Sequence, residues 1–179
     1  MPAHQQRHST SQPRSRRQVG VLFGVALVVL LSDQVSKALV VAKMADHDPI
    51  AVLGDLLRVT YTRNPGAAFS LGGGFTIVLS AIAIGVVVLI VRVSSRLASL
   101  PWALALGGLL GGALGNLSDR IFRAPAPFRG YVVDWIQLPN WPIFNIADAA
   151  IVCSAVLMVV LTLRGVSLDG TRASGKTLR

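Results

Sequence analysis

Four long runs of apolar residues divide the chain. They cover about residues 19–41, 75–91, 102–117 and 143–163. A helix needs about 20 apolar residues to cross the hydrocarbon core of a bilayer, so each run predicts a transmembrane helix. The second and third runs are short, and we expect helix tilt or local thinning of the bilayer around them. The pattern predicts an all-α membrane protein with four spans.

A mixed polar and apolar segment, residues 43–74, separates the first two runs. Residues 56–62 read Leu-Leu-Arg-Val-Thr-Tyr-Thr, a partly alternating sequence rich in β-branched and aromatic residues that predicts a strand. Asn64-Pro65-Gly66 then predicts a turn. We expect this segment to form a small β-cradle outside the membrane, between the first and second spans.

Glycines are regularly spaced in the third run. One line has four-residue spacing and a second line lies beside it: Gly107, Gly111 and Gly115, with Gly108 and Gly112. Small residues at this spacing let helix backbones approach closely, which indicates packing of the third span against its neighbours. The same close approach could bring Asn116 and Asp119 next to residues of other helices.

Basic residues gather in the tails and short loops rather than along one amphipathic face. The net charge of +9 therefore favours membrane topology over nucleic-acid binding. Ten Lys and Arg residues flank the spans on the side of both termini, against six on the other side. The positive-inside rule places both termini in the cytoplasm and the β-cradle outside it. We expect a disordered basic tail over residues 1–18, a four-span domain over 19–164 and a cytoplasmic tail over 165–179.

The first run has a second interpretation as a cleaved signal peptide, because Arg16 and Arg17 precede it. The run continues past Asp33 and Lys37, however, and no convincing small-residue cleavage site follows a compact apolar region. A retained first span is favoured. The single cysteine, Cys153, lies in the fourth run and excludes an intramolecular disulfide.

Charged residues inside or at the ends of apolar runs are costly and need an explanation. Asp33 and Lys37 are four apart, so they lie on one helix face and predict an ion pair, with either a structural role or a role in substrate contact. Asn116, Asp119 and Arg120 lie together at the end of the third run. Arg120 can hold the Asp119 carboxylate, which favours its ionised form and a structural role for Asp119.

Asp134 and Asp148 differ from the other aspartates because no basic residue lies within four positions of either. Asp134 follows two valines, an apolar setting that raises a carboxyl pKa. Asp148 lies one turn inside the predicted fourth helix, three residues after Asn145, and we expect both to project from one face. If the two aspartates meet, they share a proton, as an aspartyl peptidase requires. Lining an ion path or pairing with buried cations remains the alternative.

Other chemistries find little support in the sequence. The three histidines have no HExxH spacing, and no serine has a recognisable His or Lys partner. We expect no metal and no cofactor.

Five motifs together resemble the lipoprotein signal peptidases, also called signal peptidase II. The resemblance covers about residues 32–150, and the motifs lie at the ends of the four spans. In chain order they are Asp33-Gln34-Val35-Ser36-Lys37, Asn64-Pro65-Gly66-Ala67-Ala68-Phe69, Gly115-Asn116-Leu117-Ser118-Asp119-Arg120, Val132-Val133-Asp134 and Phe144-Asn145-Ile146-Ala147-Asp148.

The resemblance implies an aspartic endopeptidase of the bacterial inner membrane that is sensitive to globomycin. It implies a diacylglyceryl-modified prolipoprotein as substrate, cut before the lipidated cysteine in contact with membrane lipids, and we expect the enzyme to be a monomer. Asp134 and Asp148 would be the catalytic dyad. The residues that would bind substrate or support the site are Asp33, Lys37, Asn64, Gly66, Asn116, Asp119, Arg120 and Asn145.

Two loop lengths depart from the family pattern. Residues 124–130 lengthen the link to Asp134, and the stretch from Asp134 to Asp148 is rather short, which affects loop shape and substrate fit.

Two other classes of protein compete with a peptidase. A proton-relaying transporter needs a continuous polar path through the spans, and a membrane scaffold would tolerate Asp-to-Asn changes at both positions.

Overall fold

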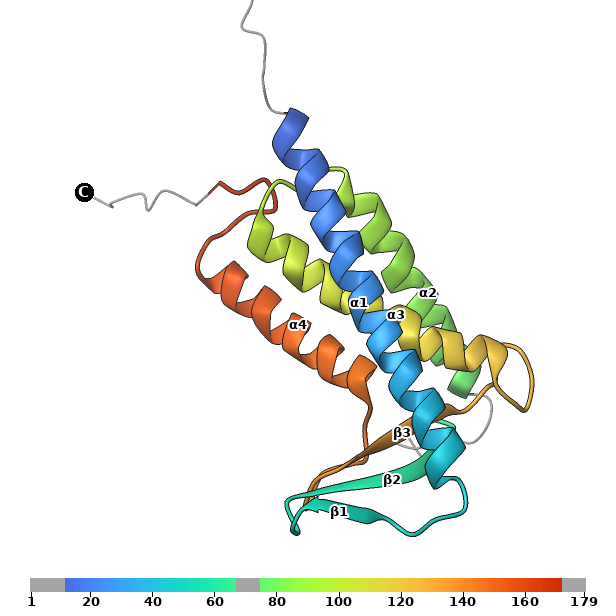
Figure 1. Cartoon of the computed structure of the whole chain (residues 1–179). Helices are drawn as coiled ribbons and strands as arrows, with labels where there is room; N and C mark the ends of the chain where they lie inside the picture. Colours follow the sequence, from blue (N-terminus) through green and yellow to red (C-terminus); the bar gives the residue numbers. More distant parts are fainter. Residues whose placement is uncertain (1–11, 67–74, 172–179) are drawn as a thin grey trace, which may run out of the picture.

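Four helices and a small sheet make up the computed structural model, which describes residues 12–66 and 75–171. Each helix is long and apolar enough to cross a membrane. The helices are α1 (Gln12–Met44), α2 (Phe75–Ser94), α3 (Leu100–Phe122) and α4 (Ile146–Leu163), and the strands are β1 (Ile50–Leu53), β2 (Leu57–Asn64) and β3 (Val132–Gln137). The predicted fold class is confirmed, with the sheet at one end of the bundle (Figure 1).

Helix α3 is the centre of the bundle and packs against the other three helices (Figure 1). Most of α3 is buried, whereas α1, α2 and α4 expose broad apolar faces. Residues on those faces include Val28, Ile82 and Val156, each more than half exposed. An apolar surface of this kind suits lipid as the surrounding medium, because lipid tails are as apolar as the side chains.

The two glycine lines of α3 face different helices. A Cβ at Gly107 or Gly111 would lie 2.6 Å from a backbone oxygen of α1, and a Cβ at Gly112 would lie 2.6 Å from the Ala147 oxygen of α4. Gly108 likewise lies against Ser154 of α4. The predicted packing role is confirmed, because any larger side chain would push the backbones apart.

The interior far from the sheet is apolar. Leu22, Ala26, Ile90, Leu97 and Leu110 are buried against one another there. Apolar packing therefore holds this part of the bundle together.

The sheet is antiparallel, with strand order β1-β2-β3. Two strands come from the segment predicted as a cradle, but β3 comes from the stretch between α3 and α4, where no strand was predicted. Its register with β2 places Arg63 opposite Val133 and Thr62 opposite Asp134. The sheet therefore fixes Asp134 to the end of the bundle.

Several boundaries differ from the sequence predictions. Helix α1 begins at Gln12, so residues 12–18, predicted as part of a disordered tail, are helical. Proline is tolerated in a first helical turn, where Pro13 lies, and Gln and Arg are good helix formers. At the other end, residues 165–171 are not a free tail, because the Leu168 oxygen accepts bonds from the backbone N–H groups of Ala98 and Ser99. The predictions for residues 1–11, 67–74 and 172–179 lie outside the described residues.

Candidate active site

Polar side chains from α1, α3, α4, β2 and β3 converge where the helix ends meet the sheet. Asp33 and Lys37 are fully buried, and Asp134 is only 2% exposed. Asp148 and Asn116 are half-buried. So many buried polar groups are stable only if they are bonded to one another.

Lys37 is the centre of the first half of this cluster. Its Nζ lies 2.7 Å from Asp33 Oδ2 and 3.0 Å from Asp119 Oδ2, and it donates to Asn116 Oδ1 at 3.2 Å. These three acceptors match the three donors of an ammonium group. The predicted ion pair of Asp33 and Lys37 within α1 is confirmed, and the contacts of Lys37 with Asp119 and Asn116 tie α1 to α3.

Asp33 also reaches α4. Its Oδ1 accepts a bond from the backbone N–H of Ala147 at 3.0 Å. This contact requires Gly115, because a Cβ there would lie 2.6 Å from Asp33 Oδ2 and 3.2 Å from the Ala147 Cβ. The glycine line thus brings the polar groups of three helices together.

The predicted pairing of Asp119 with Arg120 is wrong. Asp119 pairs with Lys37 and, at 2.7 Å, with Arg123 Nε. Its Oδ2 also accepts the backbone N–H of Val133 at 3.1 Å. The reason is helical geometry, since residues four apart share a face and adjacent residues do not. Asp119 therefore joins α1, α3 and β3.

Arg120 points elsewhere. Its side chain is nearly buried, and its Nη1 has no hydrogen-bond partner in the part of the chain that the structure describes. The charged groups that act on its guanidinium are Asp134, Asp148 and Asp119. Arg120 therefore supplies positive charge near Asp134 and Asp148 without a direct ion pair to either of them among the described contacts.

Asn145 links Asp134 to Asp148. Its Nδ2 donates to Asp134 Oδ1 at 2.6 Å and its Oδ1 accepts the Asp148 backbone N–H at 2.9 Å. Asn145 is the N-cap of α4. Asp148 Oδ2 accepts the backbone N–H of Asn145 at 3.2 Å, which completes a capping box. Both side chains reach Asn116 of α3 from the same side, as predicted, although Asn145 lies just before the helix rather than within it.

Asn116 holds the other side of Asp148. Its Nδ2 donates to Asp148 Oδ1 at 2.7 Å, while its Oδ1 accepts from Lys37 and, at 3.2 Å, from Asn145. Since the oxygen faces donors, the amide nitrogen must face the carboxylate. Lys37 thus orients the Asn116 amide toward Asp148.

Asp134 lies on β3 between two amides. Asn64 Nδ2 donates to its Oδ2 at 2.8 Å, opposite the bond from Asn145. Burial raises the pKa of Asp134 to about 6; the bond from Asn64 opposes that rise, the charge of Asp148 adds to it, and the bond from Asn145 again opposes it. The pKa is raised, as predicted from the apolar setting of Asp134, so this carboxyl group keeps its proton up to about pH 6.

Gly66 positions Asn64. Its N–H donates to Asn64 Oδ1 at 2.8 Å, and its φ of +99° favours glycine. A Cβ at this position would also lie 2.9 Å from Leu79 Cδ1. The turn therefore directs the amide nitrogen of Asn64 toward Asp134.

The arrangement suits acid–base chemistry without a metal. In the described residues, no group of three His, Cys, Asp or Glu side chains is placed to hold a metal ion. Asn145 bonds to two carboxyl groups, one buried and one half-buried: its side-chain amide donates to Asp134 and its backbone N–H donates to Asp148. Such a pair can hold one proton between them.

A sequence model of one family, described as Signal peptidase (SPase) II, matches residues 25–164. The chain belongs to the signal peptidase II family. A lipoprotein signal peptidase of Streptomyces coelicolor is 56% identical to it over 158 residues, 88% of this chain and 78% of that protein. The lipoprotein signal peptidase of Mycobacterium tuberculosis is 47% identical over 157 residues, with the same coverage of 88% and 78%.

The fold of this signal peptidase II is also found among solved structures. One, "Bacterial membrane enzyme structure by the in meso method at 2.3 A resolution", superposes with a TM-score of 0.73 at 29% identity, over 89% of this chain and 95% of that chain. As a member of the signal peptidase II family, the chain is a peptidase of the aspartic type, embedded in a membrane.

The structure brings all ten predicted site residues of this signal peptidase II to one end of the bundle. Arg123 and the Val133 N–H belong to the network and were not predicted. Gln34, noted as a polar neighbour of Asp33, donates to Asp33 Oδ2 and to the Gly115 oxygen, both at 3.1 Å. Arg123 could have been found from its spacing of four from Asp119, whereas the Val133 contact depends on a tertiary approach.

Proposed function

We propose that this chain removes the signal peptide from diacylglyceryl-modified prolipoproteins, with Asp134 and Asp148 as its catalytic pair. One observation carries the assignment of the residues: Asn145 bonds to both aspartates at the end of the bundle, where no cation bonds directly to either carboxyl group among the described residues. Membership of the signal peptidase II family supports the reaction.

The pair is suited to activate water. One carboxylate takes a proton from the water that attacks the scissile carbonyl, while the other, protonated, donates a hydrogen bond to the carbonyl oxygen. The resulting tetrahedral intermediate collapses when a proton passes to the leaving amine. Burial and the nearby charge of Asp148 raise the pKa of Asp134 to about 6, so the pair retains one proton into the mildly acidic range.

The remaining site residues hold the pair in position. Asn64 and Asn145 fix both oxygens of Asp134, and Asn116 fixes Asp148. Lys37 of α1 binds Asp33 of the same helix and Asp119 of α3, so one cation joins two helices beside the pair. The half-buried side chain of Asp148 leaves that carboxyl group open to water and substrate.

The position of the site suits a substrate that is part lipid and part peptide. The spans would accommodate the acyl chains, and the sheet would cover the signal peptide near the extracytoplasmic face. Both termini would lie in the cytoplasm, since ten flanking basic residues are on that side. We propose that the enzyme works as a monomer in contact with membrane lipids.

The test is cleavage of a synthetic prolipoprotein by the purified protein, with the products identified by mass spectrometry. We expect a single cut before the lipidated cysteine, inhibited by globomycin, and much slower cleavage of the same peptide without its diacylglyceryl group. Cleavage at another bond, or equal rates with and without the lipid, would contradict the proposed substrate.

A further inference from the structure

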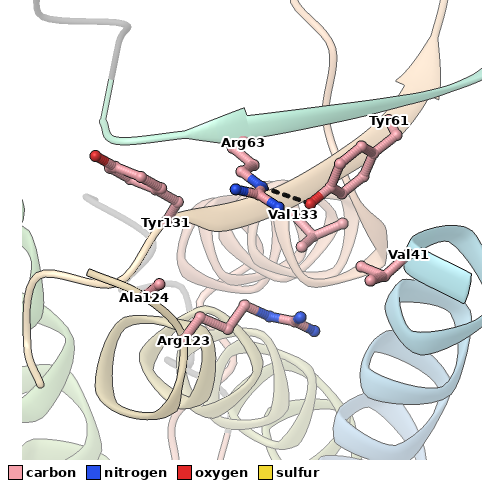
Figure 2. Close-up of a pocket in the computed structure, with 7 residues that line it drawn as sticks. All are labelled: Val41, Tyr61, Arg63, Arg123, Ala124, Tyr131 and Val133. Carbon is pink, nitrogen blue, oxygen red and sulfur yellow. Dashed lines mark hydrogen bonds between the residues drawn. The ribbon is translucent and has the colours of Figure 1, made fainter. Parts of the chain in front are cut away.

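A small cavity lies beside the site. It has a volume of about 190 Å³ and lies between the ends of α1 and α3 and the strands β2 and β3 (Figure 2). Its lining consists of Val41, Tyr61, Arg63, Arg123, Ala124, Tyr131 and Val133. Two guanidinium groups and two phenols in so small a cavity indicate a polar ligand.

The cavity is separate from the proposed catalytic pair. Successive side chains of a strand point to opposite faces, so Val133 and Asp134 lie on opposite sides of β3. Val133 lines the cavity, whereas Asp134 bonds to Asn64 and Asn145 on the other side. The cavity therefore lies behind the strand that carries Asp134.

The two arginines have donors to spare. Arg63 uses its Nε to donate to Tyr61 Oη at 2.6 Å, and Arg123 uses its Nε to donate to Asp119 at 2.7 Å. Within the described part of the chain, their terminal nitrogens donate to no protein acceptor. Figure 2 shows the guanidinium groups entering from β2 and from the end of α3. No acidic residue is among the seven that line the cavity, so the lining is positive, with the charge of Arg123 partly balanced by Asp119 behind it.

The cavity lies where the membrane spans end. Val41 is in the last turn of α1, and Arg123 directly follows α3. Lipid phosphates lie just beyond the hydrocarbon at this level, and tyrosines are enriched there. The volume is below that of pockets for drug-sized ligands, about 300 Å³ or more, so a single small group fits. Arginine forks match the oxygens of a phosphate.

We propose that this cavity binds the phosphate of an anionic phospholipid headgroup. The bound phosphate accepts bonds from the terminal nitrogens of Arg63 and Arg123. From Arg123, contacts continue to Asp119 and on to the Val133 N–H, so the lipid stabilises the end of β3 that carries Asp134. Free inorganic phosphate would bind through the same contacts, and the experiment distinguishes it from the phosphate of a phospholipid.

The test measures thermal unfolding of the full chain in an uncharged detergent, titrated separately with dihexanoyl phosphatidylglycerol, dihexanoyl phosphatidylcholine and inorganic phosphate. A ligand that binds the folded state raises Tm. We expect phosphatidylglycerol to raise the Tm at a lower concentration than either of the others. Arg63→Gln should increase the half-saturating concentration about tenfold, and Arg63→Lys should do so by less.

Arg58→Gln is the matched control, because Arg58 lies on the same strand, is exposed and pairs with Asp55 away from the cavity. It should bind phosphatidylglycerol as the wild type does. Arg123→Gln should weaken binding as Arg63→Gln does, and if it fails to fold because Asp119 loses a partner, Arg63→Gln decides. Three results would overturn the proposal. They are equally weakened phosphatidylglycerol binding in Arg63→Gln and Arg58→Gln, no rise in Tm with phosphatidylglycerol, and a rise in Tm at the same concentration of inorganic phosphate as of phosphatidylglycerol. The assay does not depend on peptidase activity.

Discussion

The two halves of the polar cluster treat their carboxyl groups differently. Around Lys37, both Asp33 and Asp119 contact a cation directly. Asp134 and Asp148 instead receive bonds from amides of Asn64, Asn116 and Asn145. In general a direct contact with a cation favours the ionised form of a carboxyl group, whereas burial without one, as at Asp134, favours the protonated form. The half around Lys37 therefore serves stability, and the half that contains Asp134 and Asp148 serves proton transfer.

Replacement of Lys37 should have the largest effect on stability. Lys37→Met leaves two buried carboxylates without their shared cation, and breaking a buried ion pair costs about 3–5 kcal/mol. We expect a large drop in the free energy of unfolding, measured by denaturant titration in micelles. The double variant Lys37→Met with Asp33→Asn should recover part of it.

The control for that loss is Arg58→Met, which breaks an exposed ion pair worth at most about 1 kcal/mol. If Lys37→Met were as stable as Arg58→Met, Lys37 would not be the centre of the structural half.

Asn145 connects Asp134 to Asp148 and should affect both activity and stability. Asn145→Ala removes the cap of α4, at a cost of about 1–2 kcal/mol, and the bond to Asp134. Misplacement of a reacting group can lower a rate about 100-fold, and we expect a loss of that order in kcat. Unfolding and cleavage assays on one preparation separate the two effects. A variant with reduced stability but normal kcat would show that Asn145 serves only as a cap.

Asn64 should control the pH dependence. Its bond favours the ionised form of Asp134, so Asn64→Ala should raise the pKa of that carboxyl above about 6. Since the pair works with one proton, the loss of activity at high pH should move to higher pH. The measurement is the pH profile of kcat, with Arg58→Gln as the control. A shift to lower pH would contradict the role of Asn64.

Neutralising an aspartate should have opposite effects on stability in the two halves. The pKa of Asp134 is about 6 in the folded protein against an ordinary value of 3.8, so the folded state binds the proton more tightly and loses stability as pH rises between these values. Asp134→Asn removes the cost of burying a charged carboxylate at neutral pH. This gain in stability is partly offset, because the new amide group fits one of the two neighbouring Asn side chains less well. We expect its Tm to equal or exceed that of the wild type, whereas Asp119→Asn should lower it. Destabilisation of both variants alike would remove the distinction between the halves.

The spans and the ion pair of Asp33 and Lys37 could be predicted from the sequence because they follow from local hydropathy and helical spacing. The catalytic pair was predicted from its resemblance to a family, because spacing alone left an ion path open. Strand β3 could not be predicted, since its partner β2 is about 70 residues away, as the bond from Asn64 to Asp134 shows. The capping role of Asn145 was missed because it depends on where α4 begins.

The central claim is that Asp134 and Asp148 do the chemistry while the groups around Lys37 hold the fold. Single-turnover cleavage of the diacylglyceryl prolipoprotein by folded Asp134→Asn and Asp148→Asn tests it most directly, with Asp55→Asn, an exposed aspartate of the same sheet, as control. The account predicts normal substrate binding and rates lowered by at least about 1,000-fold in both variants, with the control unchanged. A folded variant of either residue that cleaves within about tenfold of the wild-type rate would contradict it.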